Sequence, residues 1–238
     1  MRAMIIMSTT TITDAGFYRL LTWLSPSYPV GAFSYSHGIE YAVEAGLIAD
    51  RDRLITYIAT VLEQGSGCVD AALLSAAWHA ADRGDDDRLD EVADLACAWR
   101  GTAELALEAE TQGRAFLATT RAAWPHPRLD SFAARRAAGT IAMPVAVGVA
   151  AALHRLPLKL ALTAFLHAFA GNLVSAGIRL IPMGQTDGQR AMAALEPAVA
   201  SSVAAALATP LDEVCASAPV IDWCSMRHET QHTRLFRS

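Results

Sequence analysis

The sequence predicts an all-α protein of roughly ten helices, and three observations support this fold class. Alanine occupies 48 of the 238 positions, whereas valine and isoleucine together occupy 24. Alanine is the best helix former and β-branched residues are typical of strands, so this balance favours helices. No stretch alternates apolar and polar residues for long enough to predict a strand. Apolar residues make up 53% and charged residues 18% of the chain, a composition that supports a buried core and excludes disorder.

Helical spacing and turn residues define the elements of the first half. A loop rich in proline, glycine and serine over residues 27–34 separates two helices. Asp50 is a predicted N-cap, and the helix after it carries Leu54, Ile58 and Leu62 on one face before it ends at Gly65. In order, the sequence predicts helices over 17–24, 36–45 with Gly46 as C-cap, 51–64, 68–82, 88–99 and 102–122.

The second half is predicted to form three longer helices and a tail. Two apolar helices cover residues 131–153 and 157–181, and the loop 182–188 leads to a third helix. That helix carries an apolar stripe of Met192, Leu195, Val199, Val203 and Leu207. We therefore predict one helical domain over residues 1–210 and a C-terminal docking tail over residues 211–238.

Charge and composition exclude several classes of protein. The net charge of −5 argues against a nucleic-acid partner, including for a helix-turn-helix regulator, because such proteins carry a basic stripe. Of the 19 basic residues only Lys159 is a lysine, and it lies in Pro-Leu-Lys-Leu rather than in Gly-Lys-[Ser/Thr]. The chain therefore has no P-loop for a nucleotide.

The sequence predicts a cytoplasmic protein. The four cysteines form no C-x-x-C pair, which fits reduced thiols, and residues 1–7 are too short for a secretory signal. Either Met1 or Met7 is the start residue. The most hydrophobic run, over residues 137–153, is shorter than the roughly 20 residues needed to cross a bilayer. We expect it to be a core helix and expect no membrane partner.

The sharpest chemical motif is the H-E-x-x-H pattern of His228, Glu229 and His232. On a helix this spacing places both imidazoles on one face, where they can bind zinc, with the glutamate as general base. A catalytic zinc needs a third ligand; the residues after His232 offer none, although Cys224 lies upstream. Three interpretations stay open here: a zinc-dependent hydrolase, a weak or transient metal site, and a polar helix that docks onto a partner.

Three blocks of the sequence point to one known family. Residues 24–40 read LSPSYPVGAFSYSHGIE, residues 179–189 read RLIPMGQTDGQ, and the chain ends with MRHETQ at 226–231 and RLFRS at 234–238. In this order they resemble the N-terminal, late-middle and C-terminal signatures of the urease accessory protein UreF family. Two residues depart from the family pattern: Ala32 stands where a second glycine is common, and His232 where an aromatic residue is more frequent.

The resemblance implies an all-α homodimer without enzymatic activity or a cofactor or metal of its own. Family members are scaffolds that help deliver nickel to apo-urease. They bind the accessory protein UreD, also called UreH, and recruit the nickel-carrying GTPase UreG, whose nucleotide cycle they help control. The missing P-loop fits this role, since nucleotide chemistry would belong to the partner. The C-terminal segment of the family docks onto UreD, which would make the H-E-x-x-H match incidental.

Candidate partner-binding residues come from the same three blocks. We predict that the turn after the apolar helix either caps backbone groups or presents Arg179, Gln185 and Gln189 to the GTPase. The N-terminal block either packs internally or contacts UreG or the second copy through Ser34, Tyr35, His37 and Glu40. In the tail, interface residues are predicted at Arg227, His228, Glu229, Arg234 and Phe236. We expect this tail to be poorly ordered until a partner binds.

Overall fold

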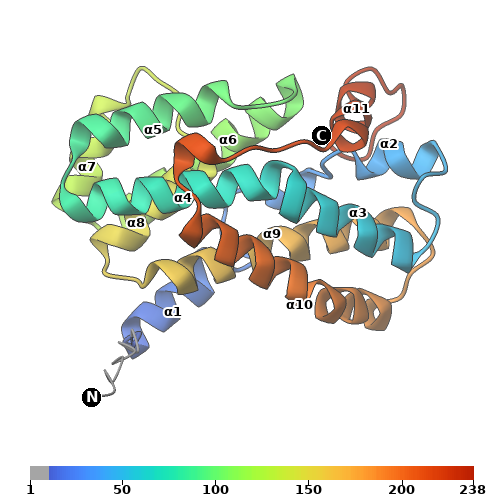
Figure 1. Cartoon of the computed structure of the whole chain (residues 1–238), viewed down its shortest axis with the longest axis horizontal. Helices are drawn as coiled ribbons and strands as arrows, with labels where there is room; N and C mark the ends of the chain where they lie inside the picture. Colours follow the sequence, from blue (N-terminus) through green and yellow to red (C-terminus); the bar gives the residue numbers. More distant parts are fainter. Residues whose placement is uncertain (1–10) are drawn as a thin grey trace, which may run out of the picture.

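The computed structural model describes residues 11–238, and within them it is helical and without strands (Figure 1). The predicted all-α fold is therefore confirmed. The elements are α1 (Asp14–Trp23), η1 (Ala32–Ser34), α2 (Ile39–Glu44), α3 (Arg51–Gln64), α4 (Ser66–Arg83), α5 (Asp86–Ala98), α6 (Ala103–Ala123), α7 (Pro127–Arg135), α8 (Met143–Leu153), α9 (Leu158–Leu180), α10 (Gln185–Ala208), η2 (Leu211–Glu213) and α11 (Pro219–His228). The choice between Met1 and Met7 lies outside the described residues.

Most predicted helix ends are confirmed within a few residues, and their caps explain why. The Asp50 carboxylate accepts the Arg53 amide N–H at 2.9 Å and starts α3 as predicted. Gly46 has φ +74°, the left-handed conformation that ends α2. The loop before α2 turns at Gly31, also at positive φ, so Ala32 needs no left-handed backbone.

Two predicted helices were wrong in extent. The single helix over 131–153 is two helices, α7 and α8, because Ala142 is extended (φ −74°, ψ 146°) and Pro144 lies in the first turn of α8. Proline has no amide N–H, so it starts a helix more readily than it continues one. The helix expected from residue 36 begins at Ile39, because His37 and Gly38 both have positive φ.

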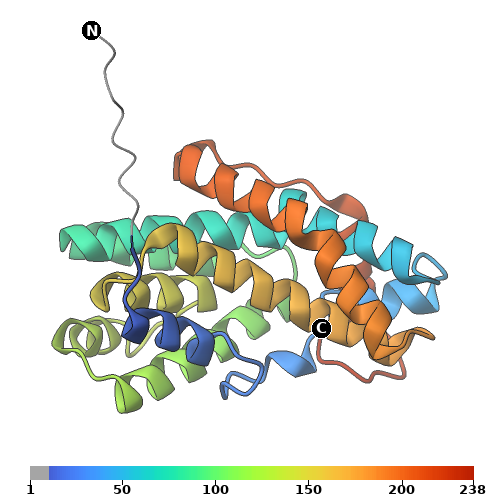
Figure 2. The same ribbon diagram turned by 90° about the horizontal axis from the view of Figure 1, so that it is seen from below.

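The core is built around α8. Every residue of this helix from Met143 to Ala152 is buried, and α4 lies along it. The contact depends on Gly148, where a Cβ atom would lie 2.5 Å from the Leu74 carbonyl oxygen of α4. Figure 2 shows α9 and α10 side by side, and α10 also contacts both α3 and α4, which follow one another end to end in Figure 1.

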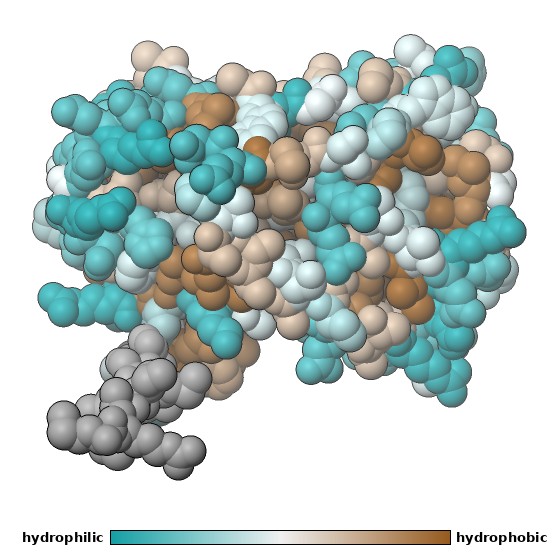
Figure 3. All heavy atoms as spheres, in the orientation of Figure 1, coloured by the Kyte–Doolittle hydropathy of each residue, from teal (hydrophilic) through white to brown (hydrophobic). Residues whose placement is uncertain are grey.

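Two helices, α9 and α10, are long and apolar enough to cross a membrane by length and composition alone. Half of the apolar window of α9 and 39% of that of α10 are buried within the chain. Such helices are also common in the cores of water-soluble proteins. On the face drawn in Figure 3, hydrophobic residues form separate patches between hydrophilic ones.

The last 28 residues return to the body of the protein. After η2, an irregular segment leads into α11 (Figure 1), and the final residues run back to the loop before α2. Ser217 fixes the connection, since its amide N–H donates to the Gln64 carbonyl oxygen at 2.8 Å. The domain boundary at residue 210 and the ordering of this tail on partner binding stay predictions.

Candidate functional site

The three sequence blocks, distant along the chain, meet at one place in the structure. At the end of α9, Arg179 donates from Nη2 to the Phe33 carbonyl oxygen at 2.7 Å. The same guanidinium lies 4.1 Å from the centroid of the Phe236 ring. Partial burial lowers the pKa of Arg179, with the Glu40 carboxylate acting in the opposite direction, and a guanidinium with so high a pKa stays charged. Arg179 therefore joins the late-middle block to both the N-terminal block and the tail.

Backbone contacts hold the tail against the N-terminal loop. The Arg237 amide N–H donates to the Ser34 carbonyl oxygen at 2.7 Å, and the Ser36 amide N–H donates to the Ser238 oxygen at 2.7 Å. Gly38 allows the close approach on the other side, because a Cβ atom there would lie 2.7 Å from the Ser225 nitrogen of α11. A glycine is required at this position both for its positive φ and for this contact.

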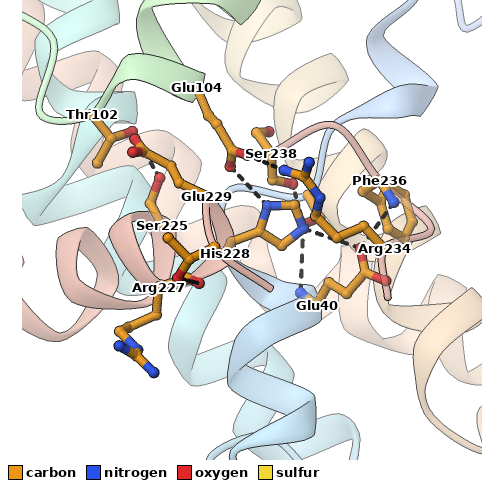
Figure 4. Close-up of polar contacts among 12 residues, drawn as sticks. Glu40, Thr102, Glu104, Ser225, Arg227, His228, Glu229, Arg234, Phe236 and Ser238 are labelled. Carbon is orange, nitrogen blue, oxygen red and sulfur yellow. Dashed lines mark hydrogen bonds and ion pairs between the residues drawn. The ribbon is translucent and has the colours of Figure 1, made fainter. Parts of the chain in front are cut away.

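At the centre of the junction lies His228, which is fully buried between two carboxylates (Figure 4). Its Nδ1 lies 2.7 Å from Glu104 Oε2, and its Nε2 lies 3.1 Å from Glu40 Oε2. A carboxylate only accepts, so each ring nitrogen that carries a proton finds an acceptor here. Arg234 donates from Nη1 to the other oxygen of Glu104 at 2.8 Å.

Glu40 binds the tail backbone as well as the imidazole. Its Oε1 accepts the Leu235 amide N–H at 2.6 Å and its Oε2 accepts the Phe236 amide N–H at 2.8 Å. Glu40 and Glu104 each lie in the first turn of a helix, α2 and α6, where the helix dipole favours a negative charge. Carboxylates in the first turns of two helices thus supply the acceptors that fix residues 228–236.

The zinc-hydrolase interpretation is not supported by this geometry. The helix α11 ends at His228, so His232 is not presented on the same helical face, and it is exposed. Both ring nitrogens of His228 already face carboxylates, and the Glu229 carboxylate accepts the Ala103 amide N–H at 3.0 Å. Cys224 is fully buried, and burial raises the pKa of its thiol. Within residues 11–238, no three histidine, cysteine or acidic side chains are grouped to hold a metal ion.

The predicted partner-binding residues fall into two groups. Five of them are buried in the chain: Tyr35, His37, Glu40, His228 and Phe236. The others are half-buried or exposed: Ser34, Arg179, Gln185, Gln189, Arg227, Glu229 and Arg234. For the buried group the structure shows internal packing of loop and tail, one of the readings that the sequence left open. Contact of either group with a partner stays a prediction.

A cavity of about 730 Å³ adjoins the junction. Arg179, Gln185 and Gln189 lie in its wall together with Phe33 and His37, so the late-middle and N-terminal blocks share this surface. Deeper in the wall, Arg100 donates to Asp70 at 2.7 Å, with both side chains largely buried. Where Asp222 lines the cavity, burial raises the pKa of its carboxyl.

The acidic side of the site was not predicted from the sequence. Glu104 and Glu108 of α6 are buried with Gln112, and all three face the loop and tail or the cavity. Their spacing of four residues was a usable signal, because it places three polar groups on one face of an alanine-rich helix. Polar residues repeated on a helix that is otherwise apolar indicate buried partners elsewhere in the chain.

Comparisons with known proteins agree on one family. A family model described as UreF matches residues 48–196. A urease accessory protein UreF of Granulibacter bethesdensis is 54% identical over 230 residues, which are 97% of each chain. A protein of the same name from Rhodopseudomonas palustris strain BisA53 is 51% identical over 94% of each chain. Another, from Bradyrhizobium sp. strain ORS 278, is 50% identical over 94% of this chain and 92% of its own.

Proposed function

Because the chain belongs to the UreF family of urease accessory proteins, we propose that it is a non-enzymatic scaffold in the delivery of nickel to apo-urease. In this role it binds UreD (UreH) and recruits the GTPase UreG, whose nucleotide cycle it modulates, as a cytoplasmic homodimer. The observation that carries the proposal is the junction of the three sequence blocks. There Arg179 contacts both Phe33 and Phe236, so one surface is shared by the loop, the end of α9 and the tail.

The outer face of α11 supports docking of the tail onto UreD. Val220, Trp223 and Met226 follow one another at intervals of three residues and are 59%, 45% and 49% exposed. Trp223 packs edge-on against Tyr41 of α2, with ring centroids 5.2 Å apart, and the Arg227 guanidinium lies 5.8 Å from the Tyr41 ring. An aromatic residue flanked by arginine and exposed aliphatic groups is typical of the centre of a protein interface.

The edge formed by Arg179, Gln185 and Gln189 supports a separate contact with UreG. These side chains are exposed at the cavity, and Phe33 beside them is 66% exposed. An arginine that is already held by a carbonyl oxygen presents its remaining N–H groups at low entropic cost. We therefore propose that UreD binds at α11 and that UreG binds at the end of α9.

The test is capture of both partners by tagged protein, with the metal content of each complex measured on the same samples. We compare wild type, a truncation after Pro219, Trp223→Ala and Arg179→Ala. Wild type is expected to retain UreD and UreG with no stoichiometric zinc. The truncation and Trp223→Ala should lose UreD, whereas Arg179→Ala should weaken UreG retention more than UreD retention.

Matched controls lie far from the junction. Arg88→Ala on α5 removes an exposed arginine paired with Glu91, and Leu95→Ala removes a 39% exposed apolar side chain. Both should bind like wild type. Failure of wild type to retain either partner, or about one zinc per chain, would overturn the scaffold proposal.

A further inference from the structure

A second polar cluster lies in the wall of the cavity and is not used by the tail contacts of His228. It consists of Ser66 at the start of α4, His37 in the loop before α2, and Glu108 in the middle of α6. His37 and Glu108 are 5% and 6% exposed, and Ser66 is half-buried at the cavity surface. Three elements that are distant in sequence therefore bring a hydroxyl, an imidazole and a carboxylate together.

The hydrogen bonds fix the direction of donation through this cluster. Glu108 accepts from Gln112 Nε2 at 2.8 Å and from Ser238 Oγ at 3.1 Å, so both of its oxygens serve as acceptors. His37 Nε2 lies 3.0 Å from the same carboxylate and must donate to it. With the proton on Nε2, the neutral ring has its lone pair on Nδ1, and Ser66 Oγ lies 3.3 Å from that atom.

The imidazole is held rigidly in this orientation. His37 has a left-handed backbone (φ +52°), which is uncommon for a residue other than glycine. The Tyr57 hydroxyl donates to the His37 carbonyl oxygen at 2.9 Å, and the Phe169 ring packs edge-on at a centroid distance of 4.8 Å. A base held by a third group, within reach of a hydroxyl, is the arrangement that activates a serine nucleophile.

The surroundings of Ser66 suit a developing oxyanion and an apolar acyl group. Ser66 is the first residue of α4, and Gly65 before it provides no side-chain cap, so the amide N–H groups of the first turn receive no acceptor from a capping side chain. Preorganised N–H groups of this kind stabilise an oxyanion. The same cavity wall contains Val69, Leu105 and Phe169, which leave room for a small apolar group.

We propose that Ser66 is an activated nucleophile that accepts acyl groups from small esters, with His37 as its general base and Glu108 as a positioning residue. The Ser66 Oγ–H proton passes to His37 Nδ1 as Oγ bonds to the ester carbonyl carbon. The ester C–O bond then breaks, and the departing oxygen takes the proton from Nδ1 and leaves as an alcohol. Water reverses the sequence, releasing the carboxylic acid and free Ser66. This acyl transfer is a second activity, separate from the scaffold role, which itself involves no catalysis, and it needs no partner.

The experiment uses the full chain and p-nitrophenyl acetate as the probe, with p-nitrophenol release followed in time and acetylated peptides mapped by mass spectrometry. Wild type is expected to give a burst of about one p-nitrophenol per chain and acetylation at Ser66. Ser66→Ala should abolish the burst, whereas Ser131→Ala, which removes an exposed hydroxyl on α7, should not change it. Absence of acetyl-Ser66 above the level of acetyl-Ser131 would overturn the proposal.

The role of His37 is tested by His37→Gly, which tolerates the positive φ and leaves a space the size of the ring. The acylation rate should fall about 100-fold and recover when imidazole is added to the buffer. Recovery also shows that the variant has folded. An undiminished rate, or a lost rate that imidazole does not restore, would contradict the assignment of His37 as base.

Glu108→Gln separates positioning from a structural role. In the wild-type background it should slow acylation, because an amide keeps one acceptor oxygen but presents an NH2 donor in place of the other, so it no longer fixes the ring with its proton on Nε2. In the His37→Gly background it should have no further effect on the imidazole-rescued rate, since no tethered ring remains to be oriented. Equal rate losses in the two backgrounds would assign Glu108 a structural role and overturn this part of the proposal.

Discussion

Between α4 and α8, alanine, valine and leucine side chains pack around Gly148 with no charged residue from α8. Between α2, α6 and the tail, an imidazole, a guanidinium and two carboxylates make the contacts instead. In the first region, stability depends on shape, because a Cβ atom at Gly148 would meet backbone. In the second it depends on the pairing of each buried polar group, because a lost partner leaves a donor or acceptor unsatisfied.

The difference also concerns what unfolds when a contact is lost. The α4–α8 contact lies in the centre of the helical domain, so its loss is expected to lower the stability of the whole domain. The tail meets the body through polar contacts, both with the side chains of Glu40, Glu104 and Arg179 and with the backbone of residues 34–36, so loss of these side chains is expected to release the tail alone.

The largest effect is expected from Gly148→Ala. The added methyl group would lie 2.5 Å from the Leu74 carbonyl oxygen and 3.1 Å from the Ala77 Cβ, so α4 and α8 must separate. Overpacking costs up to about 3 kcal/mol and the gain in helix propensity is about 1 kcal/mol, so we expect a net loss of about 2 kcal/mol in the free energy of unfolding. Urea denaturation measures it.

Gly184→Ala is the matched control, because no atom lies within 4 Å of a Cβ at that position and its φ is negative. Because Gly184 is the N-cap of α10 and alanine caps less well than glycine, it should lower the free energy of unfolding by about 0.5 kcal/mol, well below the effect at Gly148. Equal effects of the two substitutions would show that the α4–α8 contact is not set by shape.

The second prediction concerns Glu40→Gln. The amide cannot accept on both sides, so it leaves one or more of the donors at His228, Leu235 and Phe236 without an acceptor. We expect opening of the tail to become easier by about 2 kcal/mol, while the domain unfolds as before. Amide hydrogen exchange at Leu235 and Phe236, compared with amides of α4 and α8, measures the two separately.

Glu196→Gln, on the exposed face of α10, is the control for the loss of one negative charge. It should leave exchange unchanged at both places. Faster exchange throughout α4 in Glu40→Gln would show that the tail and the domain open together, and the contrast between the two regions would be wrong.

The third prediction concerns Arg179→Ala, which removes the contact with the Phe236 ring and the hydrogen bond to Phe33. The expected cost to tail closure is about 1 kcal/mol, again read from exchange at Phe236. Arg179→Lys should recover only part of it, because an ammonium lacks the planar face and the fork of donors. Full recovery by lysine would show that charge alone holds the ring.

The helical body could be predicted from the sequence because its signals are local. The stripe of Leu54, Ile58 and Leu62 and the cap at Asp50 each report on a few neighbouring residues, and α3 lies where they place it. The break between α7 and α8 was missed because the alanine-rich composition of residues 131–153 masks the effect of Pro144. The alanine content of the segment predicted one continuous helix, whereas a proline ends or starts a helix according to where it stands in the segment.

The junction could be predicted only in part. The three blocks indicated which segments matter, but not that His228 lies between Glu40 and Glu104, which are 188 and 124 residues away along the chain. The H-E-x-x-H pattern even predicted the wrong contact, because it assumed that the helix continues past His228. Such pairings follow from the tertiary fold and cannot be predicted from the local periodicity of the sequence.

The smallest predicted effect is a pH dependence of the free energy of unfolding, and it arises at the C-terminal end of the apolar helix α8. His154, at the end of α8, packs edge-on against Trp23, and its Nδ1 lies 3.4 Å from Arg19 Nη1. Burial, followed by the positive charge of Arg19 and by His126, lowers the pKa of His154 below its ordinary value of 6.5. The unfolded chain therefore binds a proton at a higher pH than the folded chain does, and this proton favours unfolding.

The contribution of His154 to the free energy of unfolding should thus be complete above pH 6.5, decrease as the pH falls below it, and level off below the folded pKa. Urea denaturation across this range, in wild type and in His154→Gln, isolates the contribution as the difference between the two curves. His79, whose pKa burial also lowers, contributes to both curves and cancels, whereas His126, whose ring centroid lies 5.7 Å from that of His154, is coupled to it, so the difference includes this coupling. Parallel curves would show that His154 has the same pKa in the folded and the unfolded chain. The apolar surroundings of α8 would then not disfavour a charge, and the contrast with the tail junction would be wrong.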